Sequence, residues 1–507
     1  MHNVRMPAPP LLGHTIGIDL GTTGARAVRI DARGALLASE TAPYPLLTPQ
    51  PGWTEQEPED WWTAAQTAIR AVVAASDAPI AAVGVTGQMH GAVFLDENDL
   101  SIRPAILWND QRTGRAAQTI DDVVGRSRLG RITGNRALTG FQAPKILWLR
   151  EAEPDRYARI RAILLPKDFL RLRLTQTYAT DASDASGTLL LDLTTRDWSA
   201  EILRALDLPA QWFPPVAESP MVTAAISAAG ARATGLPAGT PVVAGAGDNA
   251  AAAIGSGVVR DGAGLVSLGT SGVVLVHNDR AAIDSSGALH AFCAAVPGGY
   301  HLMGVMLAAG GSLRWLRDAF ARPEDTYDAL VAGAGDVEPG AQGLQFLPYL
   351  SGERTPHMDP DARGAFIGLS LAHGRAHLVR AVLEGVAFGL NEGLARMRTL
   401  GVEPAELIAT GNGMSNATWR AIIAAVLDRP LRRLLVDEGP AFGAALLAGV
   451  GIGNFGSVDE AARVVALAPQ ADLPDPALVS IYRAEYERFT RMYPALRSLR
   501  ESVAVLS

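Results

Sequence analysis

A short turn bracketed by glycines occurs twice in this chain, once near the start of each half. The first is G-T-T-G at residues 21–24, and the second is G-T-S-G at residues 269–272. Each turn lies between two apolar, β-prone runs, which predicts a hairpin whose loop is rich in backbone N–H groups and hydroxyls. Two such hairpins, each opening its own half of the chain, indicate a duplicated domain.

The two turns are suited to binding phosphate. Glycine lets a ligand approach the backbone closely, and successive N–H groups can donate to phosphate oxygens. Asp19 lies just before the first turn, where a carboxylate could hold the water shell of a Mg²⁺ ion. A single Gly-rich hairpin more often has no ligand. The prediction that a nucleotide binds with its phosphates between the two turns therefore rests on the repetition of the turn. The sequence lacks the Gly-rich loop followed by Lys-Ser/Thr of the P-loop enzymes.

Composition narrows the class of protein. The chain has 507 residues, 48% of them apolar, so several domains with sizeable cores are expected. A net charge of −8 without a basic stripe argues against nucleic acid as a partner. A single cysteine, Cys293, predicts a reducing cytoplasm, and the lack of a long apolar run predicts no membrane span. Residues 1–13, with three prolines, are expected to form a loose N-terminal extension rather than a secretion signal.

Two polar stretches in the first half follow apolar strands. T-G-Q-M-H-G at residues 86–91 follows a strand predicted over residues 80–85; Met89 and His90 either face a cleft or are a core methionine and a satisfied turn histidine. I-L-W-N-D-Q-R at residues 106–112 is either a sugar-facing rim or a strand followed by a helix cap at Asn109 or Asp110. The residues alone leave both pairs of alternatives open.

Further polar turns follow strands at residues 241–249 and 408–415. P-V-V-A-G-A-G-D-N places Asp248 at or near a helix N-terminus, where it is either a simple N-cap or a carboxylate facing a ligand. I-A-T-G-N-G-M-S precedes a helix predicted over residues 416–428, and such a turn suits the ribose or adenine end of a nucleotide, or no ligand. T-D-A-S-D-A-S at residues 180–186 is a polar loop without readable chemistry.

These strings, in this order, resemble the FGGY family of carbohydrate kinases from about Thr15 to the C-terminal helix. The resemblance rests on I-D-L-G-T-T-G, G-Q-M-H-G, I-L-W-N-D-Q-R, L-P-K-D, A-G-A-G-D-N-A, S-L-G-T-S-G, F-L-P-Y-L-S-G-E-R-T-P-H and A-V-L-E-G-V. It implies an α/β protein with two RNase H-like domains of the actin, hexokinase and Hsp70 ATPase type and an active-site cleft between them. The implied domains are 14–257, for sugar and the catalytic base, and 258–496, for the nucleotide.

The resemblance also implies roles for particular residues. Asp248 is the implied general base, and Asp19 is implied to act in catalysis near the metal, through water. The implied sugar-binding residues are Met89, His90, Asp248, Asn249 and Trp108. The implied nucleotide-binding residues are Gly21, Thr22, Thr23, Gly269, Thr270 and Ser271 at the phosphates, and Gly411, Asn412, Gly413 and Asn416 at the adenosine. Asn412 departs from the family, which usually has three consecutive glycines in that turn.

The implied reaction is transfer of the γ-phosphoryl group of ATP, with Mg²⁺, to D-xylulose, giving D-xylulose 5-phosphate. The alternative substrates for the same chemistry are ribulose, a pentulose related to arabinitol, and a hexulose. A regulator with an actin-like fold and no catalysis is the alternative from another class. The implied partners are sugar and ATP, without nucleic acid or membrane, and the sequence leaves open whether the chain forms a homodimer.

Overall fold

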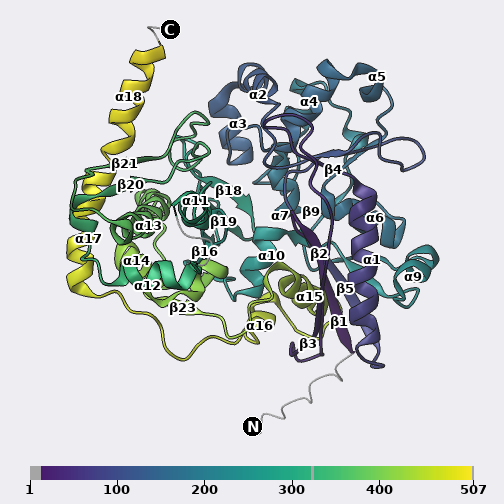
Figure 1. Ribbon diagram of the computed structural model, residues 1–507. Helices are drawn as coiled ribbons and strands as arrows, with labels where there is room; N and C mark the ends of the chain where they lie inside the picture. The colour runs from purple at the N-terminus through teal and green to yellow at the C-terminus, as the bar shows by residue number, and fades with distance from the viewer. Residues whose placement is uncertain (1–12, 321–324, 505–507) are drawn as a thin grey trace, which may run out of the picture. The chain divides into compact units, whose positions relative to one another are not determined.

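The computed structural model describes residues 13–320 and 325–504 (Figure 1). The expected extension at residues 1–13 lies, except for Gly13, outside the described residues. The described chain forms two compact units. The first comprises the residues up to Val259, Phe292–Tyr300 and Glu438–Val465; the second comprises Arg260–Ala291, His301–Asp437 and the residues from Ala466 onward.

The first unit is built on a mixed sheet with the strand order β13-β14-β5-β1-β2-β3, and β15 also pairs with β5. The predicted first hairpin is confirmed: β1 and β2 are antiparallel, and the N–H of Gly21 donates to the carbonyl of Gly24 at 3.0 Å. β5 is parallel to β1, β14 and β15. The strand bounds are β1 His14–Leu20, β2 Gly24–Ile30, β3 Leu36–Pro43, β5 Ile80–Gly87, β13 Val222–Ala225, β14 Pro241–Val243 and β15 Ala246–Gly247.

Helices of the first unit pack on this sheet in two separate apolar clusters. α1 (Pro58–Ala74) begins at a proline and buries Trp61 and Ile69 against one face of the sheet. α10 (Asp248–Gly255) and α15 (Gly439–Gly451) form the second cluster with side chains of β2 such as Val28. Because strand side chains alternate between faces, the sheet supplies both clusters. The first unit also contains β6 Val93–Leu95, β8 Ala162–Leu164, α2 Gly114–Ile120, α4 Gln142–Ala152, α6 Pro166–Thr175, β9 Thr180–Asp181 and α7 Ala182–Ala185.

α15 approaches the sheet backbone unusually closely. A Cβ on Gly17 of β1 would lie 1.9 Å from the carbonyl oxygen of Ala441, and one on Gly84 of β5 would lie 2.1 Å from that of Ala444. The hydroxyl of Thr15 donates to the carbonyl of Ala445 at 2.9 Å. This packing places a late segment of the chain in the first unit, so the compact units differ from a single division at residue 257.

The second unit repeats the same local arrangement. Its sheet has the order β18-β19-β17-β16-β22-β23, in which β16 and β17 form the predicted second hairpin and β22 is parallel to β16. α14 agrees with the helix predicted over residues 416–428. The bounds are β16 Gly264–Leu268, β17 Gly272–Asn278, β18 His290–Cys293, β19 Tyr300–Met306, α11 Gly310–Phe320, α13 Arg375–Thr399, β22 Leu407–Thr410, α14 Ala417–Leu427, β23 Leu431–Arg433, α17 Pro476–Phe489 and α18 Met492–Ala504.

Across the described ranges, no helix combines the length and the apolar character that a membrane crossing requires.

The close approach of α15 predicts that Gly84→Ala destabilises the protein by at least about 2 kcal/mol, because the added methyl group meets a backbone carbonyl that has little room to move. Gly114→Ala is the matched control, since a Cβ there meets nothing within 4 Å and alanine favours the helix. Thermal and urea unfolding measure both variants. Equal midpoints for the two variants would contradict the packing described.

Candidate functional site

Three parallel strands of the first unit end together. Asp19 of β1 and Ala246 of β15 are both in register with Thr86 of β5, one on each side. Neighbouring strands are about 4.8 Å apart, so the residues that follow them gather at one edge of the sheet. That edge carries Asp19, the Met89–His90 turn after β5, and Asp248 after β15.

Asp248 is the first residue of α10, and Gly247 occupies the N-cap position. The simple N-cap interpretation of Asp248 is therefore wrong. Its Oδ1 accepts hydrogen bonds from the backbone N–H of Asn249 at 2.7 Å and from Nδ2 of Asn249 at 2.9 Å. Burial raises the pKa of Asp248 to about 6, although these two hydrogen bonds oppose the rise. The carboxylate is thus ionised at neutral pH but is more basic than an exposed aspartate.

Asp19 is the second carboxylate at this edge. Burial and the negative charge of Asp248 raise its pKa to about 7, although Arg26 opposes both effects. Among the described residues, no hydrogen-bond donor reaches Oδ1 of Asp19. A buried carboxylate oxygen without a donor fits a role beside a hydrated cation. No cluster of three or more His, Cys, Asp or Glu in the described chain could hold a metal by itself, so protein ligation here would be sparse.

Met89 and His90 are both buried in the turn after β5. The sulfur of Met89 lies 4.0 Å from Nδ2 of Asn249, which joins this turn to the turn at Asp248. His90 has a left-handed φ of 68°, and its Nδ1 lies 2.6 Å from the carbonyl oxygen of Gly187. Its ring packs edge-on against Phe141 at 4.9 Å. The structure thus places Met89 next to Asn249. The ring of His90 is hydrogen-bonded and packed within the protein, as the interpretation of a satisfied turn histidine requires.

Polar side chains from other parts of the first unit form hydrogen bonds with the first glycine turn. Nε2 of Gln56 donates to the carbonyl of Thr22 at 2.7 Å, and the indole N–H of Trp108 donates to the hydroxyl of Thr22 at 3.2 Å. The hydroxyl of Tyr44 donates to the carbonyl of Gly21. Thr23 is exposed at the tip. The turn is therefore positioned by its carbonyl groups and by one of its two hydroxyls.

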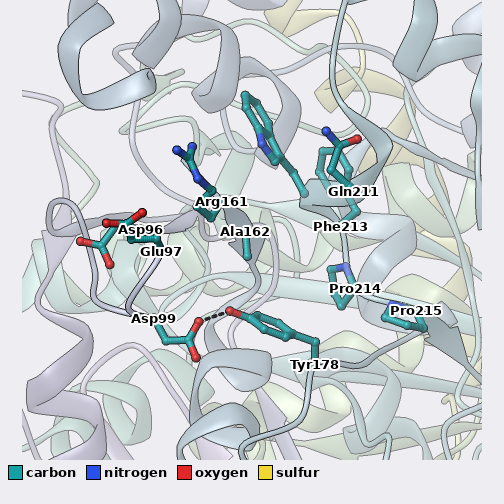
Figure 2. Close-up of a pocket in the computed structure, with 11 residues that line it drawn as sticks. Asp96, Glu97, Asp99, Arg161, Ala162, Tyr178, Gln211, Phe213, Pro214 and Pro215 are labelled. Carbon is teal, nitrogen blue, oxygen red and sulfur yellow. Dashed lines mark hydrogen bonds between the residues drawn. The ribbon is translucent and has the colours of Figure 1, made fainter. Parts of the chain in front are cut away.

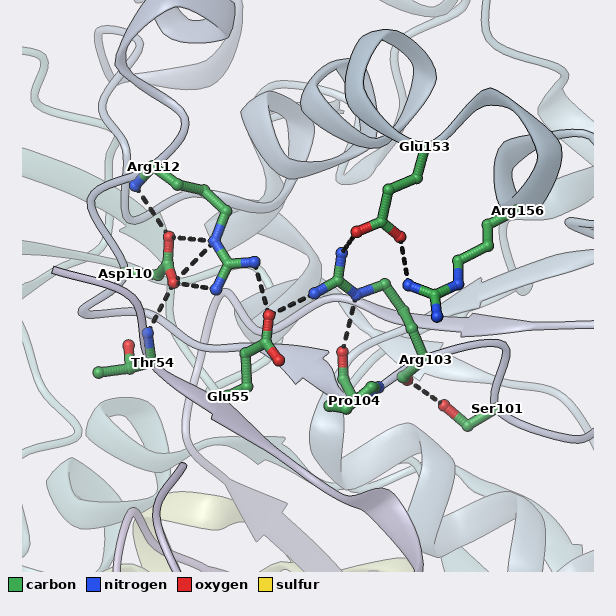
Figure 3. Close-up of polar contacts among 9 residues, drawn as sticks. All are labelled: Thr54, Glu55, Ser101, Arg103, Pro104, Asp110, Arg112, Glu153 and Arg156. Atoms are coloured by element: carbon green, nitrogen blue, oxygen red, sulfur yellow. Dashed lines mark hydrogen bonds and ion pairs between the residues drawn. The ribbon is translucent and has the colours of Figure 1, made fainter. Parts of the chain in front are cut away.

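The rest of the stretch from 106 to 112 has a different role from that of Trp108. Asp110 is fully buried and accepts from the backbone N–H of Thr54 at 2.7 Å and from Nη2 of Arg112 at 2.7 Å (Figure 3). Arg112 also reaches Glu55, which pairs with Arg103. Asn109 and Asp110 do not cap the following helix, whose N-cap is Thr113. The cap interpretation is wrong, and Asp110 is a buried structural anion rather than part of a sugar-facing rim.

The second unit contains the remaining predicted residues. The backbone N–H of Gly269 donates to the carbonyl of Ser271 at 3.0 Å, and the N–H groups of Gly310 and Gly311, at the start of α11, donate to the carbonyls of Gly269 and Thr270 at 2.9 and 3.0 Å. α11 therefore supports this turn directly.

The turn predicted to contact adenosine lies at the end of β22. Gly411 has a left-handed φ of 86°, and a Cβ there would lie 2.8 Å from the carbonyl oxygen of Leu268, so glycine is required. Asn412 is exposed. Asn416 caps α14, because its Oδ1 accepts from the backbone N–H of Trp419 at 3.1 Å. The side-chain oxygen of Asn416 is thus already engaged in capping α14.

Sequence reasoning missed a buried ionic cluster beneath the Asp248 turn. Nζ of Lys167 lies 2.5 Å from Asp168, 3.0 Å from Asp181 and 3.8 Å from Asp184, and all four side chains are buried. A Cβ on Gly247 would lie 3.3 Å from Oδ1 of Asp184. The available signal was the apolar context of Lys167 and Asp168 in L-L-P-K-D-F-L, which is unusual for charged residues, whereas the polar stretch at residues 180–186 carried no such signal.

A separate hollow of about 440 Å³ in the first unit does not coincide with the predicted site (Figure 2). Its wall combines acidic side chains with aromatic residues and prolines, and the hydroxyl of Tyr178 donates to Asp99 across it. None of the predicted catalytic, sugar-binding or nucleotide-binding residues lines it.

Comparisons with known proteins give one consistent family. The FGGY family of carbohydrate kinases, N-terminal domain, matches residues 14–255, and the C-terminal domain of that family matches residues 264–452. A xylulose kinase of Escherichia coli (strain K12) is 41% identical over 486 residues, covering 96% of this chain and 99% of the relative. A gluconokinase of Bacillus subtilis (strain 168) is 29% identical over 467 residues, covering 90% and 91%. The crystal structure of xylulose kinase from Rhodospirillum rubrum matches with a TM-score of 0.89 and 32% identity, covering 96% of this chain and 99% of that one.

The raised pKa of Asp248 predicts that Asp248→Asn stabilises the protein above pH 6. Burying the charge costs up to about 3 kcal/mol there, and the cost vanishes below pH 3.8, where the folded and unfolded states are both protonated. Asp284→Asn is the opposite control, because Arg396 and Ser286 lower the pKa of Asp284 to about 2 and its ionised form stabilises the fold. Thermal midpoints at pH 8 should rise for the first variant and fall for the second. A fall for both would contradict the pKa assignment.

Proposed function

Because this chain belongs to the FGGY family of carbohydrate kinases, we propose that it transfers the γ-phosphoryl group of ATP to the terminal hydroxyl of D-xylulose, giving D-xylulose 5-phosphate. Its fold is the two-domain fold of that family, an actin- and hexokinase-like ATPase. Relatives named xylulose kinase, similar over nearly the whole chain, support this substrate. The observation that carries the chemistry is the basic, partly accessible carboxylate of Asp248 at the edge where three parallel strands end.

Asp248 is the proposed general base. The attacking hydroxyl loses its proton as the bond to phosphorus forms, and a carboxylate with a pKa of about 6 is ionised at neutral pH and ready to accept it. Asn249 holds Oδ1 of Asp248 through two hydrogen bonds, which orients the carboxylate and leaves Oδ2 as the proton acceptor. Phosphoryl transfer depends mainly on such alignment.

The sugar is proposed to contact Met89, His90, Asn249 and Trp108 besides Asp248. The contact of Met89 with Asn249 supports a shared surface for a small ligand. The similarity to a gluconokinase favours one alternative in particular, a sugar acid as the preferred substrate of the same chemistry. The regulator without catalysis has no such support.

The nucleotide is proposed to bind through the two glycine turns and the turn after β22. Gly21, Thr22 and Thr23 in one hairpin and Gly269, Thr270 and Ser271 in the other are proposed to donate to the phosphates. Both turns join antiparallel strands and have additional support, from Trp108 and Gln56 in one case and from α11 in the other. Gly411, Asn412, Gly413 and Asn416 are proposed to contact the adenosine, and the exposure of Asn412 leaves its amide available there.

Asp19 is proposed to hold Mg²⁺ through water. The buried Oδ1 that no described donor reaches, together with the raised pKa, fits a carboxylate whose charge a cation would stabilise. When bound, the cation offsets negative charge on the phosphates. Asp19 itself accepts hydrogen bonds from the hydration shell and keeps that shell beside the first turn.

The proposed base predicts that Asp248→Ala lowers kcat for D-xylulose at least about a hundredfold, because the proton acceptor is lost. Sugar-stimulated ADP release is measured with D-xylulose, D-ribulose, D-fructose and D-gluconate. Asp279→Ala removes an exposed carboxylate and should leave turnover unchanged. Near-normal turnover of Asp248→Ala would exclude Asp248 as the base. A preference for another sugar in the wild-type protein would replace the substrate but keep the mechanism.

The proposed role of Asp19 predicts that Asp19→Asn raises the Mg²⁺ concentration for half-maximal activity by about tenfold, because a neutral amide binds the hydration shell less strongly. Mg²⁺ is titrated at fixed ATP and sugar in both proteins. An unchanged Mg²⁺ dependence with a lowered kcat would place Asp19 elsewhere in the mechanism.

A further inference from the structure

A chain of buried polar contacts runs from Lys167 to the residue before Asp248. Nζ of Lys167 forms an ion pair with Oδ1 of Asp181 at 3.0 Å. The hydroxyl of Ser183 donates to Oδ2 of Asp181 at 2.5 Å and accepts from the backbone N–H of Gly247 at 3.2 Å. Lys167, Asp181, Ser183 and Gly247 are all buried.

The chain connects elements that the sequence keeps far apart. Lys167 lies in α6, Asp181 ends β9 and Ser183 lies in α7, whereas Gly247 ends β15 and is the N-cap residue of α10. The position of the Gly247 N–H fixes the entry of α10, and Asp248 is the next residue. Among the described residues, Ser183 is the side chain whose hydrogen bonds join Asp181 of the ionic cluster to the N–H of Gly247, the residue before Asp248.

Further contacts also restrict the turn at Gly247. The Cα face of Gly247 is covered by Met89 and Asp184, since a Cβ there would lie 3.0 Å from Cγ of Met89 and 3.3 Å from Oδ1 of Asp184. Gly247 is also paired with Gly87 in the sheet. A small shift at the N–H of Gly247 would accordingly be passed on to Asp248 rather than absorbed.

We propose that Ser183, anchored by Asp181 and Lys167, is a positioning residue that holds Asp248 in the orientation needed for phosphoryl transfer. The proposal rests on the proposed function of Asp248 as the base. Ser183 does not touch the reacting atoms and acts through the backbone of Gly247. Loss of its hydroxyl leaves a buried N–H without an acceptor and lets the turn relax, and misplacement of a catalytic group by a fraction of an ångström is costly in rate.

Ser219 provides a matched control. Its hydroxyl donates to the same Oδ2 of Asp181 at 3.0 Å and it is equally buried, but its side chain makes no bond to Gly247. The backbone carbonyl of Ser219 accepts from the N–H of Gly245, a bond that alanine keeps. Ser183→Ala and Ser219→Ala thus both remove one donor to Asp181, and only the first releases Gly247.

The experiment measures kcat, the sugar KM and the thermal midpoint for the full-length wild type and both alanine variants. Ser183→Ala should lower kcat about tenfold with little change in sugar KM, whereas Ser219→Ala should stay within about twofold of wild type. Ser183→Ala should lose the more thermal stability, because it also leaves the buried N–H of Gly247 without an acceptor. Equal kcat values for the two variants would overturn the proposal. Ser183→Cys serves if Ser183→Ala does not fold, because cysteine keeps the volume and a weak acceptor. The cysteine variant should show an intermediate loss of kcat, and a wild-type kcat would overturn the proposal.

A double variant separates positioning from structure. Ser183→Ala in the Asp248→Ala background should have no further effect on the residual rate, because the group that Ser183 positions is gone. A further tenfold loss would show that Ser183 acts elsewhere. A wild-type protein inactive on every sugar tested, or an active Asp248→Ala, would instead refute the proposed function, so the two failures are distinguishable.

Discussion

The parallel pairing of β5 with β1 on one side and with β15 on the other is the constraint on which the first unit depends. It aligns three strand ends and thereby gathers Asp19, Met89 and Asp248 from positions more than two hundred residues apart in the chain. Side chains at the carboxyl ends of parallel strands are free to face a ligand, because the strands stop there and the backbone turns away. The chemistry of the site follows from this alignment.

The same alignment creates an electrostatic problem. Two carboxylates at one edge repel each other, and burial raises the pKa of both. Hydrogen bonds from Asn249 oppose the rise at Asp248, and Arg26 opposes the rise at Asp19. Lys167 lies below the turn in an ion-pair cluster with three aspartates. A buried charge cluster of this kind adds little net stability, because desolvation offsets attraction. A polar anchor beneath the proposed base is consistent with a reaction that depends on alignment.

The close approach of α15 to β1 and β5 is the second condition for the site. The absent side chains of Gly17 and Gly84 allow helix backbone to lie on strand backbone, and α10 packs against the same helix. α10 begins at Asp248, so the packing that closes the core also supports the helix that carries the proposed base. Stability and catalytic geometry therefore share residues in this unit.

Sequence alone predicted the two hairpins, the helix over residues 416–428, and Asp19, Met89, Asn249 and Asp248 as residues of interest. These features are local: strand periodicity, glycine turns and helix starts depend on neighbours in the chain. The sequence also gave two interpretations of the stretch from 106 to 112, and only the structure assigned Asp110 to a buried network with Arg112 while Trp108 reaches Thr22. Tertiary structure alone placed residues 438–465 with the first unit and brought Lys167, Asp181 and Ser183 beneath Gly247. Long-range packing decided these points, because which buried charges meet depends on the register of strands and helices distant in sequence, and no local pattern encodes that register.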